Sequence, residues 1–195
     1  MFNFKLIYYD KNIIVINKPV GIIFSKIYNC NLIKKKGYLP NKGILNRLDK
    51  YTSGIILIAR NITFYFFFKK LLLLRIIKKK YKTFFLSKKK GYINLSLKKK
   101  KFVFLKKKEK KSLTYYNIIK NFKNINFYNI CIKTGRTHQI RIHIKHINLN
   151  LFKNNNFLKH LHYYSIMFYY PFIKKNFNLF CKTSIELKKN ILINL

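Results

Sequence analysis

Short apolar runs rich in β-branched and aromatic residues alternate along this chain with lysine clusters and turn residues. Runs of this length predict strands, because branched and ring side chains pack well on a pleated, half-buried surface. Lysine clusters between the runs, such as 88–90 and 98–101, are typical of hairpin loops on a mostly antiparallel sheet. The predicted strands are residues 12–17, 54–60, 81–86, 92–97, 112–119, 127–132 and 158–168.

Two segments have helical rather than strand spacing. Asn61 is a candidate helix N-cap, and the apolar residues after it recur at helical intervals up to Ile77. Residues 137–147 place their isoleucines on one helical stripe. The polar, lysine-rich residues 25–42 predict a loop. The sequence therefore predicts an α+β fold, in which flanking helices cover a mixed, mostly antiparallel sheet within a single domain spanning 1–195.

The chain carries 43 lysines and arginines against 4 acidic residues, a formal net charge of +39. This excess favours a polyanionic partner such as nucleic acid, because cations gain affinity by displacing counterions from phosphates. A+T-rich codons explain the same composition, because Lys, Asn, Ile, Phe and Tyr are abundant while Ala59 is the single alanine. The charge therefore favours nucleic-acid binding without establishing it.

Nothing in the sequence predicts a membrane span, a secretory signal or a disulfide framework. The most apolar stretch, 62–77, is interrupted by two lysines and an arginine. Asp10 and Lys11 interrupt the N-terminal apolar stretch before a signal peptide would be complete. The three cysteines are odd in number and far apart, which suits a reducing compartment. We therefore expect a cytoplasmic protein that does not bind membranes.

The four acidic residues differ in their surroundings. Glu109 lies in a lysine cluster, Glu186 lies near C-terminal lysines, and Asp10 is typical of a turn. Asp49 follows an Arg-Leu pair and precedes Thr-Ser-Gly and an apolar strand, with no second acid for a paired-carboxylate mechanism. A single carboxylate can act as nucleophile or base beside a cation. The alternative is a turn aspartate that bonds its own backbone.

The histidines and cysteines do not predict a metal site. His143 and His146 lie three residues apart on the second predicted helix, but no nearby carboxylate or thiolate supports them as ligands. No pair of cysteines has metal-ligand spacing. The Gly135-Arg136-Thr137 run at the start of this helix is a weak signal for binding one anion.

Four segments, taken in order, resemble the motifs of one family. They are residues 9–21 (YDKNIIVINKPVG), 45–60 (LNRLDKYTSGIILIAR), 79–84 (KKYKTF) and 134–146 (TGRTHQIRIHIKH). In this order they resemble the opening, catalytic, tyrosine and basic-helix motifs of the RluA-type RNA pseudouridine synthases. Leu161-His162 with Pro171 is similar to a late feature of that family. The resemblance spans most of the chain.

The chain also departs from this family pattern. Asn46 stands where the catalytic motif usually has histidine, and the Gly-Asp that commonly follows the basic helix is absent. Residues 153–160 are shorter than the family pattern. The first motif begins close to residue 1, so we expect no separate S4-like RNA-binding domain. The chain resembles the short form of the family.

The resemblance implies an enzyme that isomerises a uridine in RNA to pseudouridine, without metal or cofactor. The N1–C1′ bond breaks, the uracil turns, and C5 bonds to C1′. The implied substrate is large-subunit rRNA or tRNA, and the implied fold has an RNA-binding cleft across one face of the sheet. We expect a monomer. The alternative is a non-catalytic RNA-binding or ribosome-assembly protein on the same scaffold, a reading that Asn46 keeps open.

The resemblance also implies roles for particular residues. Asp49 is the implied catalytic carboxylate, Arg141 is the cation that keeps it ionised, and Tyr81 stacks on the uracil. Arg47 is placed to fill the gap that a flipped uridine leaves in the RNA stack. The predicted catalytic residues are thus Asp49, Tyr81 and Arg141, and the predicted substrate-binding residues are Arg47, Arg136, His138 and Gln139.

Overall fold

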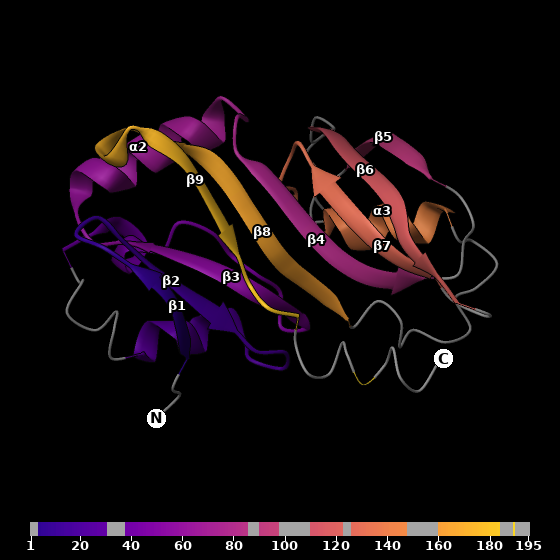
Figure 1. Ribbon diagram of the computed structural model, residues 1–195, viewed down its shortest axis with the longest axis horizontal. Coiled ribbons are helices and arrows are strands. Elements are labelled where there is room, and N and C mark those ends of the chain that lie inside the picture. The colour runs from indigo at the N-terminus through magenta and orange to yellow at the C-terminus, as the bar shows by residue number, and fades with distance from the viewer. Residues whose placement is uncertain are drawn as a thin grey trace, which may run out of the picture.

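One twisted sheet organises the part of the chain that the structure describes (Figure 1). This computed structural model describes residues 4–30, 38–85, 90–97, 110–122, 126–147, 160–183 and 189. The strands are β1 (Lys5–Tyr9), β2 (Ile13–Lys18), β3 (Thr52–Ala59), β4 (Lys78–Phe85), β5 (Gly91–Leu97), β6 (Lys110–Asn121), β7 (Asn126–Ile132), β8 (Leu161–Tyr170) and β9 (Lys175–Phe180).

The strand order in this sheet is β1-β2-β3-β8-β4-β7-β6-β5, and β9 pairs with β8 beside this path. β3 and β8 run parallel, whereas the other pairings among the described strands are antiparallel. β8 has two partners along one edge: residues 161–163 pair with β3, and residues 165–170 pair with β9. This long strand therefore joins the two halves of the sheet seen left and right in Figure 1.

Two α-helices, α2 (Ile62–Leu73) and α3 (Gln139–Ile147), accompany the described strands. Short 3₁₀ helices span Phe24–Asn29, Pro40–Gly43 and Pro171–Ile173. The predicted α+β fold, with its mixed and mostly antiparallel sheet and flanking helices, is confirmed. Within the described ranges, neither helix has the length and apolar character needed to cross a membrane.

α2 begins where the sequence predicts, because the Asn61 side chain accepts a hydrogen bond from the Phe64 amide at 2.8 Å. Its apolar face packs on the second half of β8. The Phe68 ring meets Phe168 edge-on at 5.4 Å, and Phe64 meets Tyr170 at the same distance. These buried aromatic pairs hold the helix against the sheet.

α3 packs on β5 and β6 through the predicted isoleucine stripe, of which Ile140 and Ile144 are buried. His143 lies on the same face and is fully buried, with Nε2 2.9 Å from Oγ of Ser112 on β6. Burial lowers the pKa of His143 to about 4, and the neighbouring His146 adds to this shift. His143 is therefore a neutral residue that helps to hold α3 against β6. The helix, held in this way, orients the residues at its N-terminal end.

Each predicted strand overlaps an observed one, but β1 and β9 were not predicted. Both are partly exposed, and their mixed polar and apolar residues give a weaker pattern than the buried strands do. The prediction of one loop over residues 25–42 was partly wrong, because 3₁₀ helices occupy both of its ends. Residues 31–37 and most of the lysine clusters at 88–90 and 98–101 lie outside the described residues.

Asp10 forms a hydrogen-bond centre between β1, β2 and β8. Its carboxylate accepts hydrogen bonds from the amides of Asn12 and Ile13 and from the hydroxyls of Tyr8 and Tyr170, at 2.7–2.9 Å. Burial alone would raise the pKa of Asp10, but these hydrogen bonds outweigh it and lower the pKa. The predicted turn role of Asp10 is confirmed.

We expect Asp10→Asn to reduce the free energy of unfolding near neutral pH by about 1–2 kcal/mol, because an amide cannot accept all four hydrogen bonds. The pKa of Asp10 is lower in the folded chain than its ordinary value of 3.8. Its contribution is therefore present above that value and disappears as pH falls through the folded pKa. Chemical denaturation of both proteins across acid pH checks this. A difference that stays constant down to strongly acid pH would contradict it.

Candidate active site

A cavity of about 750 Å³ opens where the segment before β3, the strands β4 and β8, and the start of α3 meet. Segments far apart in the sequence thus share one cleft. The cavity walls include every residue predicted for the site: Arg47, Asp49, Tyr81, Arg136, His138, Gln139 and Arg141.

Asn46 anchors the segment that carries Asp49. Its side-chain amide donates to the Ile55 carbonyl at 2.9 Å, and its carbonyl oxygen accepts the Leu57 amide at 2.8 Å. The Leu45 amide also donates to the Leu57 carbonyl, at 2.9 Å. Residues 45–46 are therefore hydrogen-bonded to β3. Asn46 departs from the family motif but still positions this segment.

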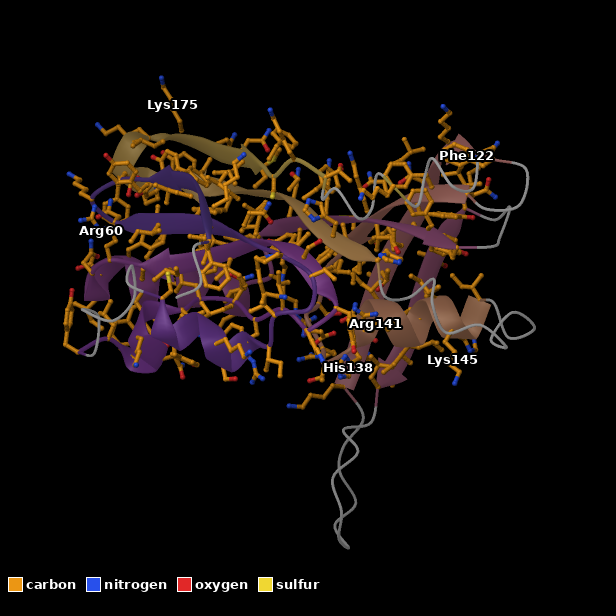
Figure 2. The ribbon with its side chains drawn as sticks, turned by 90° about the horizontal axis from the view of Figure 1, so that it is seen from below. Arg60, Phe122, His138, Arg141, Lys145 and Lys175 are labelled. Carbon is orange, nitrogen blue, oxygen red and sulfur yellow. The ribbon has the colours of Figure 1, made fainter. Side chains whose placement is uncertain are left out.

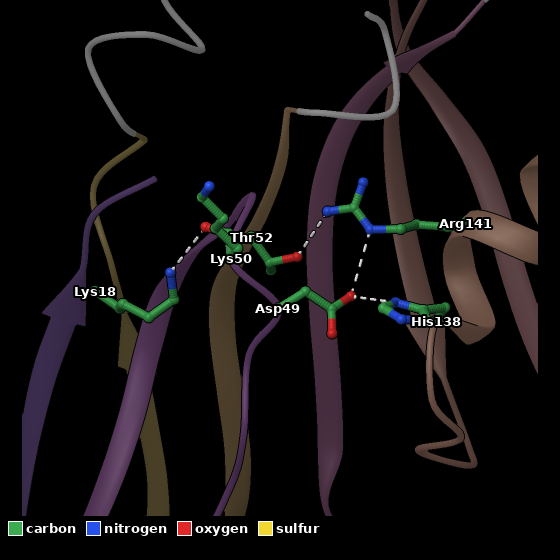
Figure 3. A network of polar contacts seen from close by, with 6 residues as sticks. All are labelled: Lys18, Asp49, Lys50, Thr52, His138 and Arg141. Carbon is green, nitrogen blue, oxygen red and sulfur yellow. Dashed lines mark hydrogen bonds and ion pairs between the residues drawn. The ribbon is translucent and has the colours of Figure 1, made fainter. Parts of the chain in front are cut away.

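Lys18, the last residue of β2, also supports the segment that carries Asp49. Its side chain is fully buried, and Nζ donates to the carbonyls of Pro19, Ile22 and Lys50 at 2.9–3.2 Å. Burial lowers the pKa of Lys18 to about 8, while attraction to the charge of Asp49 opposes this shift. Figure 3 shows the bond to Lys50, which fixes the turn immediately after Asp49.

One oxygen of the Asp49 carboxylate contacts nitrogen atoms of two side chains, His138 and Arg141 (Figure 3). Oδ2 lies 2.8 Å from Nδ1 of His138 and 3.4 Å from Nε of Arg141. Arg141 also donates to Oγ1 of Thr52 at 3.0 Å, so its guanidinium is fixed against β3. Among the described residues, Oδ1 has no recorded hydrogen-bond partner, and this oxygen is the one available to a ligand.

His138 takes an unusual backbone conformation immediately before α3. Its φ of 54° lies in the left-handed region, which is uncommon for a residue with a side chain. Figure 2 shows His138 and Arg141 together near the start of α3, with Lys145 farther along the helix. The sequence predicted His138 as a substrate-binding residue; the structure places it directly on Asp49.

Gln139 lies inside the fold, with its amide occupied on all sides. Oε1 accepts from Oγ1 of Thr134 and from the Arg136 amide, and Nε2 donates to the Leu113 carbonyl and to Oγ1 of Thr114. Its residue exposure is 2%. In the structure, Gln139 holds the loop before α3 to β6, and its predicted role in substrate binding stays a prediction.

Tyr81 contributes a flat wall to the cavity. Its ring stacks on Tyr163 from β8, with centroids 4.6 Å apart and planes 14° from parallel. Burial, reinforced by the charge of Asp49, raises the pKa of Tyr81 far above its ordinary value, so its phenol stays neutral. Sequence reasoning missed Tyr163. A signal was present in its position directly after the Leu161-His162 feature.

Arg47 lies exposed at the cavity rim, where its guanidinium stacks on the Phe24 ring at 5.2 Å. Arg136 is partly buried, and its main-chain amide is held by Gln139. The described lining holds one carboxylate, Asp49, against several cations: Arg47, Lys50, Arg75, Lys79, Lys133, Arg136 and Arg141. This imbalance favours an anionic ligand.

No group of three or more His, Cys, Asp or Glu side chains in the described ranges is arranged to hold a metal ion. Cys30, Cys131 and Cys181 are free thiols. The described cavity walls combine one carboxylate, several cationic side chains, a histidine and two stacked phenols.

The fold is shared with solved structures. The chain matches the structure titled Human RNA Pseudouridylate Synthase Domain Containing 4 with a TM-score of 0.72 at 19% identity, over 96% of this chain and 92% of that one. It also matches Human RNA Pseudouridylate Synthase Domain Containing 1, with a TM-score of 0.65 at 15% identity over 99% and 96% of the two chains. The twisted mixed sheet of this chain is thus shared with pseudouridine synthase structures.

Sequence comparison leads to the family itself. The family model described as RNA pseudouridylate synthase matches residues 12–146, which include all seven predicted site residues. The chain belongs to this family. It is 32% identical over 161 residues to the ribosomal large subunit pseudouridine synthase D of Buchnera aphidicola subsp. Schizaphis graminum, covering 74% of this chain and 51% of that protein.

A second relative gives a similar picture. The chain is 32% identical over 172 residues to the ribosomal large subunit pseudouridine synthase C of Rickettsia bellii, covering 78% of this chain and 56% of that protein. The chain thus spans about half the length of the curated relatives it matches.

Proposed function

We propose that this chain isomerises a uridine in RNA to pseudouridine, with Asp49 as the catalytic carboxylate. The observation that carries the proposal is the pairing of Asp49 with Arg141 and His138 at Oδ2, which leaves Oδ1 without a hydrogen-bond partner among the described residues. Arg141 and His138 hold in place the carboxylate that nucleophilic attack or proton abstraction would use. The reaction breaks N1–C1′, forms C5–C1′, and moves one proton from C5 to N1.

The neighbouring groups fit a flipped uridine. Tyr81, backed by Tyr163, offers a rigid and uncharged ring on which a uracil can stack. Its neutral phenol can also donate or accept a hydrogen bond at the base edge. The uridine reaches this wall only outside the RNA stack, because a stacked base hides its glycosidic bond.

The proposed substrate is an rRNA or tRNA uridine, with large-subunit rRNA favoured by the printed names of the relatives. We also propose a cytoplasmic monomer that works without metal or cofactor. The anchoring of Asn46 to β3 argues against the non-catalytic alternative, because the altered motif still supports Asp49.

The direct test incubates the purified chain with rRNA and tRNA transcripts and maps pseudouridine at nucleotide resolution. We expect conversion of one or a few defined uridines. RNA binding without any pseudouridine would favour the non-catalytic alternative, and a chain that neither binds nor modifies RNA would refute both.

RNA affinity should depend steeply on salt. The cleft and surface cations act mainly on phosphates, and phosphate contacts release counterions when they form. With about six phosphates contacted, affinity falls by about 10³-fold between about 50 and 200 mM salt. Binding of a stem-loop RNA measured at several salt concentrations checks this. If RNA affinity did not change with salt concentration, codon composition alone would explain the net charge.

Arg47→Ala should slow turnover on structured RNA by about 10–100-fold, because we propose that the Arg47 guanidinium fills the gap left by the flipped base. Loss should be smaller on an unstructured oligonucleotide, where little stacking is broken. Lys42→Ala is the matched control, since the Lys42 ammonium lies over the Tyr28 ring at 5.7 Å, outside the cavity walls. An equal loss of turnover on the structured and the unstructured RNA would contradict this role of Arg47. So would an equal loss in Arg47→Ala and Lys42→Ala.

A further inference from the structure

Lys79 lies on the same face of β4 as Tyr81. The two residues are two positions apart on one strand, so their side chains point to the same side, about 7 Å apart along it. Both line the cavity, whereas the intervening Lys80 does not. Lys80 lies opposite Cys131 of β7 in the strand register, and its side chain is on the other face of the sheet.

The ammonium of Lys79 is packed against the loop that precedes α3. A methyl group placed on Gly135 would lie 3.6 Å from Nζ of Lys79, so the ammonium rests directly over this glycine. No carboxylate or carbonyl partner of Lys79 is recorded among the described residues. Burial lowers the pKa of Lys79, while Cys131 acts in the opposite direction.

Arg136 follows this glycine and presents a second unmatched donor. Its Nε is buried and has no hydrogen-bond partner within the described part of the chain. The loop around it is rigidly held, because Gln139 bonds both the Arg136 amide and Thr134. The carboxylate of Asp49 pairs with Arg141 and His138 instead, and no ion pair joins it to Lys79 or Arg136 among the described residues.

We propose that Lys79 and Arg136 form a phosphate subsite, which binds a phosphodiester group of the nucleotide whose base lies against Tyr81. A phosphate stands one sugar away from its base, which matches the spacing of Lys79 and Tyr81 along β4. An anion bound there would satisfy both the half-buried ammonium and the buried Nε with charge-assisted hydrogen bonds. The inference rests on the proposed function for the identity of the base beside it.

The site explains why the Lys79 ammonium and the Nε of Arg136 lie in a cleft without hydrogen-bond partners among the described residues. A buried cation without a partner destabilises the fold, so removing it should leave the fold as stable or make it more stable. We therefore expect Lys79→Met to melt at the wild-type temperature or above it. This outcome also separates a loss of binding from a loss of folding.

The test measures binding of uridine, uridine 5′-monophosphate and uridine 3′-monophosphate to the full chain by nuclear magnetic resonance titration. We expect at least one monophosphate to bind about tenfold more tightly than uridine. Lys79→Met and Arg136→Gln should remove this preference, and Lys79→Arg should retain it. Lys80→Met removes the same charge from the same strand on its other face, and should keep the preference.

Equal affinity for uridine and both monophosphates, absence of binding included, would overturn the subsite. So would equal loss of the preference in Lys79→Met and Lys80→Met, because bulk charge would then explain the binding. The two proposals fail separately. A phosphate preference without pseudouridine formation would remove the enzymatic function and retain the subsite, whereas pseudouridine formation without the preference would remove only the subsite.

Discussion

Asp49→Asn should lower pseudouridine formation by about 10³-fold or more, to below detection. Asparagine keeps the shape of the side chain and can still accept a hydrogen bond from His138 or Arg141, but it cannot act as a nucleophile or base. No other carboxylate lines the described part of the cavity, so no substitute is at hand. RNA affinity should hold or rise, because one negative charge near the phosphates is gone. Pseudouridine mapping and RNA binding measured on the same preparation check both expectations.

Asp10→Asn is the matched control for this experiment. It removes the same charge from the hydrogen-bond centre on β1 and β2, away from the cavity walls. At a temperature where both variants remain folded, Asp10→Asn should retain turnover. Substantial activity in a folded Asp49→Asn protein would refute the mechanism and return Asp49 to the role of a turn residue, because asparagine makes the same turns.

Gly54→Ala should destabilise the chain by about 3 kcal/mol, which combines backbone strain with overpacking. Gly54 lies where β3 runs parallel to β8, with φ of 112°. A Cβ there would stand 2.1 Å from the main-chain oxygen of Tyr163, which no side-chain movement relieves. Because Tyr163 backs Tyr81, we also expect turnover to fall in any fraction that remains folded.

Gly135→Ala provides the comparison for Gly54→Ala. Gly135 has no left-handed φ, and its added methyl group would meet Nζ of Lys79 only at ordinary contact distance, 3.6 Å. Its melting temperature should stay near that of the wild type. Chemical denaturation of both variants measures the difference, and equal stability of the two would show that β3 can move away from β8 at little cost.

Much of the sheet could be predicted from local pattern. β2 and β3 are buried apolar runs rich in branched side chains, which favour the pleated surface of a strand. The start of α2 was predicted because a capping side chain acts within one helical turn of itself. β1 and β9 escaped prediction, since a partly exposed strand depends on its neighbour for pairing more than on its own residues.

The site was predicted in part. Asp49, Tyr81 and Arg141 could be chosen because their motifs are short and each was visible within one segment. The contact of His138 with Asp49 spans 89 residues of sequence. It depends on a left-handed backbone turn at His138 that places the ring beside the carboxylate. Gln139 stands next in the same motif, yet its side chain turns inward to β6.

The sequence by itself determined most of the segments that become strands and helices, with β1 and β9 as exceptions, and which segments carry the chemically distinctive side chains. It did so because propensity, capping and apolar periodicity act over a few neighbouring residues. Only the tertiary structure decided that β8 enters between β3 and β4, so that Tyr163 backs Tyr81 and Gly54 meets a main-chain oxygen. Those contacts follow from strand order and register, which arise from the packing of the whole sheet.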